Sequence, residues 1–311
     1  MVSRVSTGQY FDNSTTQLTA LQNSLSKTQT QLSTSLNIVN PSDAPDKASL
    51  VSKLNTQISQ QNDYNTTLQT LQTSLQTQDT ALQNVSTVLT KMKELMTQAA
   101  NDTTSVSDRA TIAQQLTQLR DQVLSIANTK DSDGNFIFAG SKVATTPFAP
   151  NAAGVIDYTG DQQRNLVPVG NSLSLHSNTP GSDAFVRVDR PDGKGGTIGV
   201  GFFQSFGDAI DAVKGSNQPN MQRALGEINQ LTLGVSSADA DVGTTMQTAT
   251  TQASILSETT VTLKSTLSNV QDLDYTAAIT KMNKDELALQ AAQSTFAKIS
   301  QQSLFKYISG S

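Results

Sequence analysis

A seven-residue spacing of apolar side chains runs through both ends of this chain of 311 residues and limits its possible folds more than any other feature. No glycine or proline occurs between Asp46 and Ala100, so one helix of about 75 Å, at 1.5 Å per residue, is predicted. Such a long helix with one apolar face is typical of a coiled coil. The expected core of this first rod is Leu54, Leu68, Leu71, Leu75, Leu82, Val85, Leu89 and Met92.

The second half of the chain repeats this pattern. A series from Met221 to Val270 keeps the seven-residue spacing without a slip and predicts a second rod. Its expected core residues are Ile228, Val235, Val242, Leu256 and Leu263. Shorter helices with the same spacing are expected at both ends of the chain. Breaks at Pro41/Pro45 and at Asp272/Asp274 separate them from the rods.

The middle of the chain, residues 131–219, has a different character. Glycine and proline concentrate there, helical periodicity disappears, and short apolar runs such as Phe136–Gly140 and Ile198–Phe203 predict short β-strands. A β domain between two helical arms requires the arms to be antiparallel, with the β domain at one tip and both termini at the other end.

The predicted fold is therefore mainly α with a β-rich insert. The N- and C-terminal regions form long antiparallel helical coiled-coil rods, and the small β domain lies at the tip. The predicted divisions are an N-terminal helix (1–40), the first half of the rod (41–130), a β-rich outer domain (131–219), the second half of the rod (220–272) and a C-terminal helix (273–311).

Composition excludes several chemistries. The chain has no cysteine, which removes disulfides, thiol catalysis and thiolate metal sites, and its one histidine, His176, removes histidine-pair metal motifs. No catalytic, cofactor-binding or metal-binding residue is predicted, and an enzyme is not expected. A net charge of −5 without basic runs predicts no nucleic-acid partner. No apolar run approaches the ~18 residues of a membrane helix, so membrane insertion is not expected.

Polar residues dilute the apolar seams, and two interpretations of this remain open. In the first, a self-contained bundle uses the polar positions to set its register. In the second, the terminal helices complete their burial only against other subunits, because a short amphipathic helix is marginal alone in water. The polar seam positions are Thr28, Ser35, Gln61, Gln78, Thr232, Asp239 and Thr260. The residues expected at an assembly interface are Leu18, Leu21, Leu25, Leu32, Met282, Leu289, Phe296, Ile299, Leu304 and Phe305.

Several motifs resemble those of the bacterial flagellin family, which includes the flagellins and the hook–filament junction proteins. The matching segments are Arg4–Thr7, Gln31–Thr34, Pro41–Pro45, Asn128–Asp131, Gly134–Gly140, Pro147–Phe148, Tyr158–Asp161, Leu289–Ser300 and Ser303–Ile308. The ending Ser-Leu-Phe-x-Tyr-Ile at 303–308 looks like a junction protein and not like flagellin itself. One departure is Ser35-Leu36-Asn37, where the family usually has glycine and a basic residue.

The resemblance implies a structural adaptor of the bacterial flagellum at the hook–filament junction. Its implied partners are copies of itself in a ring, the first hook-associated protein, flagellin, and a cytoplasmic flagellar export chaperone that binds the C-terminal helix. Secretion would use the flagellar type III export channel without a cleaved signal peptide. The terminal helices would form the inner tube, the rods the next shell, and the β domain the outer surface. Flagellin itself and a soluble coiled-coil binding module remain alternative functions.

Overall fold

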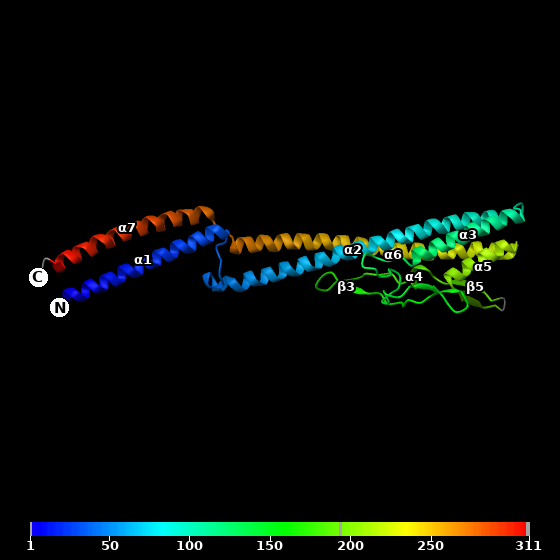
Figure 1. Ribbon diagram of the computed structural model, residues 1–311, viewed down its shortest axis with the longest axis horizontal. Helices are drawn as coiled ribbons and strands as arrows, with labels where there is room; N and C mark the ends of the chain where they lie inside the picture. The colour runs from blue at the N-terminus through cyan, green and yellow to red at the C-terminus, as the bar shows by residue number, and fades with distance from the viewer. Residues whose placement is uncertain (1, 193–194, 309–311) are drawn as a thin grey trace. The chain divides into compact units, whose positions relative to one another are not determined.

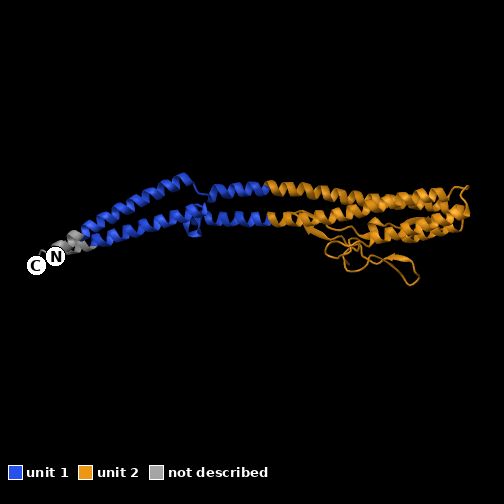
Figure 2. Cartoon of the chain, turned by 45° about the horizontal axis from the view of Figure 1, so that its top comes forward, with its two compact units in different colours: residues 1–60, 259–311 blue, residues 61–258 orange. Residues whose placement is uncertain are grey.

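The computed structural model describes residues 2–192 and 195–308, with side chains over 9–192 and 195–300. The chain forms two compact units, shown in Figure 2. Unit 1 consists of residues 1–60 and 259–311, and unit 2 of residues 61–258. Both ends of the chain therefore contribute to unit 1, and unit 2 is one continuous segment.

The helices are long toward both ends of the chain and short in its middle (Figure 1). They are α1 (Val2–Thr34), α2 (Pro45–Ala99), α3 (Val106–Ala127), α4 (Gly181–Ala184), α5 (Phe202–Lys214), α6 (Gln218–Gln271) and α7 (Tyr275–Ile308), with a 3-10 turn at Pro41–Asp43. Pro45 occupies the first position of α2, where its missing N–H has no intrahelical acceptor and its fixed φ suits a helix. The chain is thus mainly α, as the sequence predicts.

Among the described residues, each strand pairs with its neighbour in sequence, forming antiparallel hairpins in unit 2. The pairs are β1 (Phe148–Pro150) with β2 (Ile156–Tyr158), β3 (Leu166–Pro168) with β4 (Ser174–His176), and β5 (Val188–Pro191) with β6 (Thr197–Val200). In register, Phe148 lies opposite Tyr158, and Val188 opposite Val200. Because an isolated two-stranded hairpin is marginal in water, the hairpins depend on packing against the helices for their stability.

The core of unit 2 joins the rod helices to the insert. Apolar side chains from α2, α3, α5 and α6 form one buried cluster with residues of the insert. At its centre Phe185 makes edge-on ring contacts, with centroids 5.3 Å from Phe138, 5.0 Å from Phe148 and 5.1 Å from Phe202. Aromatic pairs in this geometry add stability beyond the area that they bury. This aromatic cluster anchors the insert to α5.

Two elements of the insert differ from the prediction. Residues 202–214 form the amphipathic helix α5 where a β-rich region is predicted. Of the run Ile198–Phe203, only residues 198–200 are strand. Short apolar runs are ambiguous between strand and helix, and here the two elements meet at Gly201. Phe136–Gly140 forms no strand, apart from a single bridge between Phe136 and Lys130.

The insert folds back along the helices of unit 2, whereas the sequence analysis places it at the tip of the rods. Gln78 of α2 donates to Ser177 O (3.0 Å), and Gln252 of α6 donates to Val169 O (3.1 Å). The far end of α2 instead approaches the start of α6, where Gln218 donates to Asp102 Oδ1 (2.9 Å). The insert buries its apolar residues in one cluster with α2, α3, α5 and α6, and this contact keeps it along the helices.

Candidate assembly interface

In unit 1, α1 and α7 pack against each other as an antiparallel pair. The rings of Phe11 and Phe296 meet edge-on with centroids 5.5 Å apart, and Ser24 donates to Asp285 Oδ2 at 2.7 Å. On α7 the residues that face α1 follow the alternating three- and four-residue steps of a heptad seam. They are Ala278, Met282, Asp285, Leu289, Ala292, Phe296 and Ile299.

This seam is only partly covered. The predicted interface residues Leu18, Leu21, Leu25, Leu32, Met282, Leu289, Phe296 and Ile299 are all half-buried. Leu304 and Phe305 belong to α7, but their side chains lie outside the described residues. Among the described side chains of unit 1, the fully buried ones are Thr28, Ile38, Leu54 and Ala278. Two helices alone cannot enclose a seam, because each covers only one side of the other.

The predicted rod residues have a different environment. In α2 these are Leu54, Leu68, Leu71, Leu75, Leu82, Val85, Leu89 and Met92, and all are buried. In α6, Ile228, Val235, Val242 and Leu256 are buried. Leu263, which lies in unit 1, is half-buried.

A polar cluster interrupts the seam between α1 and α7. Lys281 donates to Asp285 Oδ2 (2.7 Å) and to Thr28 Oγ1 (3.2 Å), and Ser24 also donates to Asp285. The hydrogen bond from Lys281, followed by that from Ser24, lowers the pKa of Asp285. The sequence analysis missed Ser24, Lys281 and Asp285. The signal was present, because Asp285 occupies a heptad position three residues after Met282.

In unit 2, the motifs Gly134–Gly140 and Tyr158–Asp161 contact each other. Gly140 has φ +71°, and a Cβ there would lie 2.1 Å from Asp161 Oδ1, so only glycine fits. The Asp161 carboxylate accepts from Ser141 Oγ (2.5 Å) and Ser141 N (2.7 Å), and these bonds lower its pKa. Tyr158 Oη lies 2.6 Å from Asp161 O and 3.0 Å from Phe138 O. Burial raises the pKa of Tyr158 to about 12, so its hydroxyl remains a donor.

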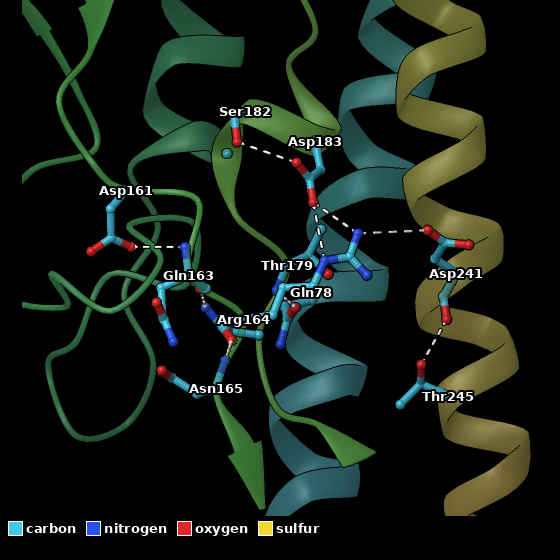
Figure 3. Close-up of polar contacts among 12 residues, drawn as sticks. Gln78, Asp161, Gln163, Arg164, Asn165, Thr179, Ser182, Asp183, Asp241 and Thr245 are labelled. Carbon is cyan, nitrogen blue, oxygen red and sulfur yellow. Dashed lines mark hydrogen bonds and ion pairs between the residues drawn. The ribbon is translucent and has the colours of Figure 1, made fainter. Parts of the chain in front are cut away.

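Gln78, which the sequence analysis counts as a weak seam residue, attaches the insert to α2. Its side chain is 1% exposed, and it accepts from Thr179 N (2.9 Å) while donating to Ser177 O. Figure 3 shows this pair beside Arg164, whose guanidinium donates to Asp183 Oδ2 at 2.8 Å and lies 3.9 Å from Asp241. Gln78 therefore satisfies a buried main-chain donor and an acceptor and does not merely dilute the seam.

A second charged cluster ties the β5–β6 hairpin to two helices. Arg190 of β5 donates to Glu227 of α6 at 2.7 Å and to Asp208 of α5 at 2.6 Å. Glu227 is 4% exposed, and Arg223 lies 3.2 Å from it. The hydrogen bonds to Glu227 hold the pKa of Arg190 above its usual value. These four charges balance, which is the condition for burying ionised groups.

Within the described residues, no three His, Cys, Asp or Glu side chains gather in a group that could hold a metal ion. In the same part of the chain, no helix has the length and apolar character needed to cross a membrane.

The family models agree with this arrangement of helices. The bacterial flagellin N-terminal helical region matches residues 5–143, and the bacterial flagellin C-terminal helical region matches residues 225–308. The chain therefore belongs to the bacterial flagellin family. Together the two matches include all of α2 and α7 and most of α1 and α6.

Among its relatives, the chain is 27% identical to flagellar hook-associated protein 3 of Salmonella typhimurium over 316 residues, with 97% of this chain and 99% of the relative covered. It is 28% identical to flagellar hook-associated protein 3 of Escherichia coli over 291 residues, covering 89% and 90%. The flagellar hook-associated protein 3 of Legionella pneumophila has the same fold, with a TM-score of 0.65, 17% identity, and 71% and 98% of the two chains covered. These relationships identify a structural, non-enzymatic component of the bacterial flagellum.

Proposed function

We propose that this protein is the structural adaptor of the hook–filament junction, assembled as a ring of copies between the first hook-associated protein and the flagellin filament. The observation that carries the proposal is the half-buried seam of unit 1. A Leu or Phe side chain stabilises a protein by about 1.5–3 kcal/mol when it is fully buried. In the free chain, Leu18, Leu25, Leu289 and Phe296 realise only part of that stabilisation, and the remainder is available for association.

The similarity to relatives named flagellar hook-associated protein 3 supports the junction in preference to the filament. In this proposal the terminal helices (1–40 and 273–311) form the inner tube of the ring. The rod segments (41–130 and 220–272) form the next shell, and residues 131–219 form the outer surface. Export through the flagellar type III channel, with a chaperone on the C-terminal helix, completes the proposal.

A pair of matched substitutions in α7 tests the role of the seam. Leu289 is half-buried in the seam, whereas Leu287, two residues earlier, is 69% exposed. Each variant, Leu289→Asp or Leu287→Asp, is expressed in a strain from which the gene has been deleted. We expect Leu289→Asp to leave hooks intact but without filaments, with the filament subunit lost to the medium. Leu287→Asp should restore filaments. Normal motility with Leu289→Asp would contradict the proposal.

The deletion strain also distinguishes the proposal from its alternatives. Loss of flagellin to the medium from intact hooks is the expected phenotype of a missing junction. If the purified protein instead polymerised into long filaments, it would be a filament subunit. A stable isolated dimer that neither joins the flagellum nor changes motility would indicate a coiled-coil binding module.

A further inference from the structure

The two chain breaks of unit 1 are bonded to each other. One break follows α1 and the other separates α6 from α7. Asn37 N donates to Gln271 O at 2.8 Å, Leu273 N donates to Ser35 O at 3.1 Å, and Leu36 and Asp272 form an antiparallel bridge. In two separate loops, these main-chain N–H and C=O groups would ordinarily form hydrogen bonds with water. Here the breaks form a short two-stranded joint.

Within the joint, Ser35 itself has an unusual backbone conformation. Its φ is +63°, in the left-handed region that favours glycine and costs other residues roughly 1–2 kcal/mol. A left-handed residue directly after a helix reverses the chain direction, which brings Ser35 O to the N–H of Leu273. A non-glycine residue keeps such a conformation only where its surroundings enforce it.

The side chain of Ser35 supplies one such constraint. Its hydroxyl is hydrogen-bonded to the hydroxyl of Tyr275, the first residue of α7. Tyr275 is itself held at a capped helix start, because Asp274 Oδ1 accepts from Ala277 N at 3.0 Å. The contact therefore links the residue that follows α1 to the first turn of α7.

Neighbouring contacts add to the joint on its other side. Gln31 Nε2 donates to Asn37 O at 2.6 Å, and Gln271 Nε2 donates to Ile38 O at 3.3 Å. Ile38 is 5% exposed. Lys27 pairs with Asp43 at 2.8 Å. The joint thus combines main-chain pairing with one of the few buried side chains of unit 1.

We propose that Ser35 and Tyr275 are positioning residues that clasp the two breaks together, so that α1 and α7 leave the joint in one register. Apolar residues alone do not define this register, because a slip of seven residues along α7 would again place Met282, Leu289 and Phe296 against leucines of α1. The clasp goes beyond the junction role, since it concerns the free chain and is tested without a flagellum.

Hydrogen exchange of the purified full-length chain tests the clasp. We expect the amides of Asn37 and Leu273 to be protected although neither residue is helical. Tyr275→Phe removes only the hydroxyl and should accelerate exchange at both amides at least tenfold. Tyr10→Phe, at another exposed tyrosine, is the matched control and should change neither. If both amides exchange in the wild type at unfolded rates, or if Tyr275→Phe leaves them unchanged, the proposal is wrong.

Substitutions of Ser35 separate its backbone conformation from its hydroxyl. Ser35→Gly relaxes the left-handed strain but loses the hydroxyl, and Ser35→Ala keeps the strain without the hydroxyl. Exchange at Leu273 should therefore increase more in Ser35→Ala than in Ser35→Gly. When Tyr275→Phe is combined with either variant, it should add less than its effect alone, because the contact is already absent. Fully additive effects would overturn the pairing of Ser35 with Tyr275.

Disulfide trapping gives a readout of register that does not depend on exchange rates. The chain has no cysteine, so Leu36→Cys with Asp272→Cys introduces one pair, at positions bridged in the joint and within the Cα range of a disulfide. We expect rapid oxidation, slowed several-fold by Tyr275→Phe. A pair displaced along α6, Leu36→Cys with Ser265→Cys, should remain reduced. Equal oxidation of the two pairs would show that the breaks are not held in one register, contrary to the proposal.

Discussion

The same seven-residue series has opposite environments in the two units. In α6 the series is buried at Val235, Val242, Ala249 and Leu256 in unit 2. One step later, in unit 1, Leu263 and Val270 are half-buried. The spacing and the type of side chain do not change at this point. Burial changes because α3, α5 and the insert cover the rod helices in unit 2, and none of these segments belongs to unit 1.

A heptad pattern therefore specifies which face of a helix is apolar, but it does not specify how completely other segments bury that face. In unit 2, α3, α5 and the insert join the rod helices in one buried cluster. Within the described side chains of unit 1, the same pattern produces a seam that is open to further partners.

Truncating one phenylalanine in each unit should give the largest difference in stability between the two units. Phe206 is fully buried, and Phe206→Ala should lower the free energy of unfolding of unit 2 by about 3–5 kcal/mol. Phe296→Ala removes the same atoms from a half-buried site and should cost about 1–2 kcal/mol in the free chain. Urea unfolding followed by circular dichroism measures both. Equal losses would mean that unit 1 is as well packed as unit 2.

Adding one methyl group tests how rigid unit 2 is. Gly140→Ala forces an alanine into φ +71° and against the Asp161 carboxylate, and it should cost about 2–3 kcal/mol. The control is Gly134→Ala, which has a similar φ of +84° with no atom within 4 Å of the added carbon. It should cost only the conformational strain of about 1–2 kcal/mol. A similar cost for both variants would show that the contact with Asp161 can relax.

A substitution of Gln78 tests whether this residue only dilutes the apolar seam or attaches the insert to α2. Gln78→Leu has a similar size but leaves Thr179 N without its acceptor, and it should destabilise unit 2 by about 1–3 kcal/mol. If Gln78 only diluted the apolar seam, leucine would instead increase stability. Thermal unfolding of the two proteins decides the sign.

The smallest expected effect is an opposite response of the two units to pH. Asp285 in unit 1 has a lowered pKa because of Lys281, so the stability that it contributes is present above its usual 3.8 and is lost as pH falls through the lowered value. Asp239 in unit 2 has a raised pKa because of burial and the nearby Asp79. Its contribution is fully present below 3.8 and is lost as pH rises through the raised value.

Asparagine substitutions isolate each response. Urea midpoints between pH 3 and pH 6 should show that Asp285→Asn removes a loss of stability on the acid side. Asp239→Asn should remove a loss of stability that occurs as the pH rises. If both variants changed the pH profile in the same direction, the two carboxyl groups would have similar environments.

Particular residues show how far the sequence could predict this molecule. The rods and the break at Pro41/Pro45 follow from local chemistry, because helix periodicity and proline act within a few residues. Helix α5 was missed, since its first residues continue an apolar run that begins in β6. Asp285 was missed because a charge at a heptad position acquires meaning only from the Ser24 and Lys281 side chains beside it.

The sequence by itself determined which residues are apolar and at what spacing, and through that the long antiparallel helices. It also determined the absence of cysteine and of paired histidines. Only the tertiary structure decided which seam is closed and which stays open, where the insert lies along the helices, and that Ser35 meets Tyr275. The physical reason is that periodicity is a local property of one helix. Burial and hydrogen bonding depend on segments that are distant in sequence, whose arrangement is known only when the chain is folded.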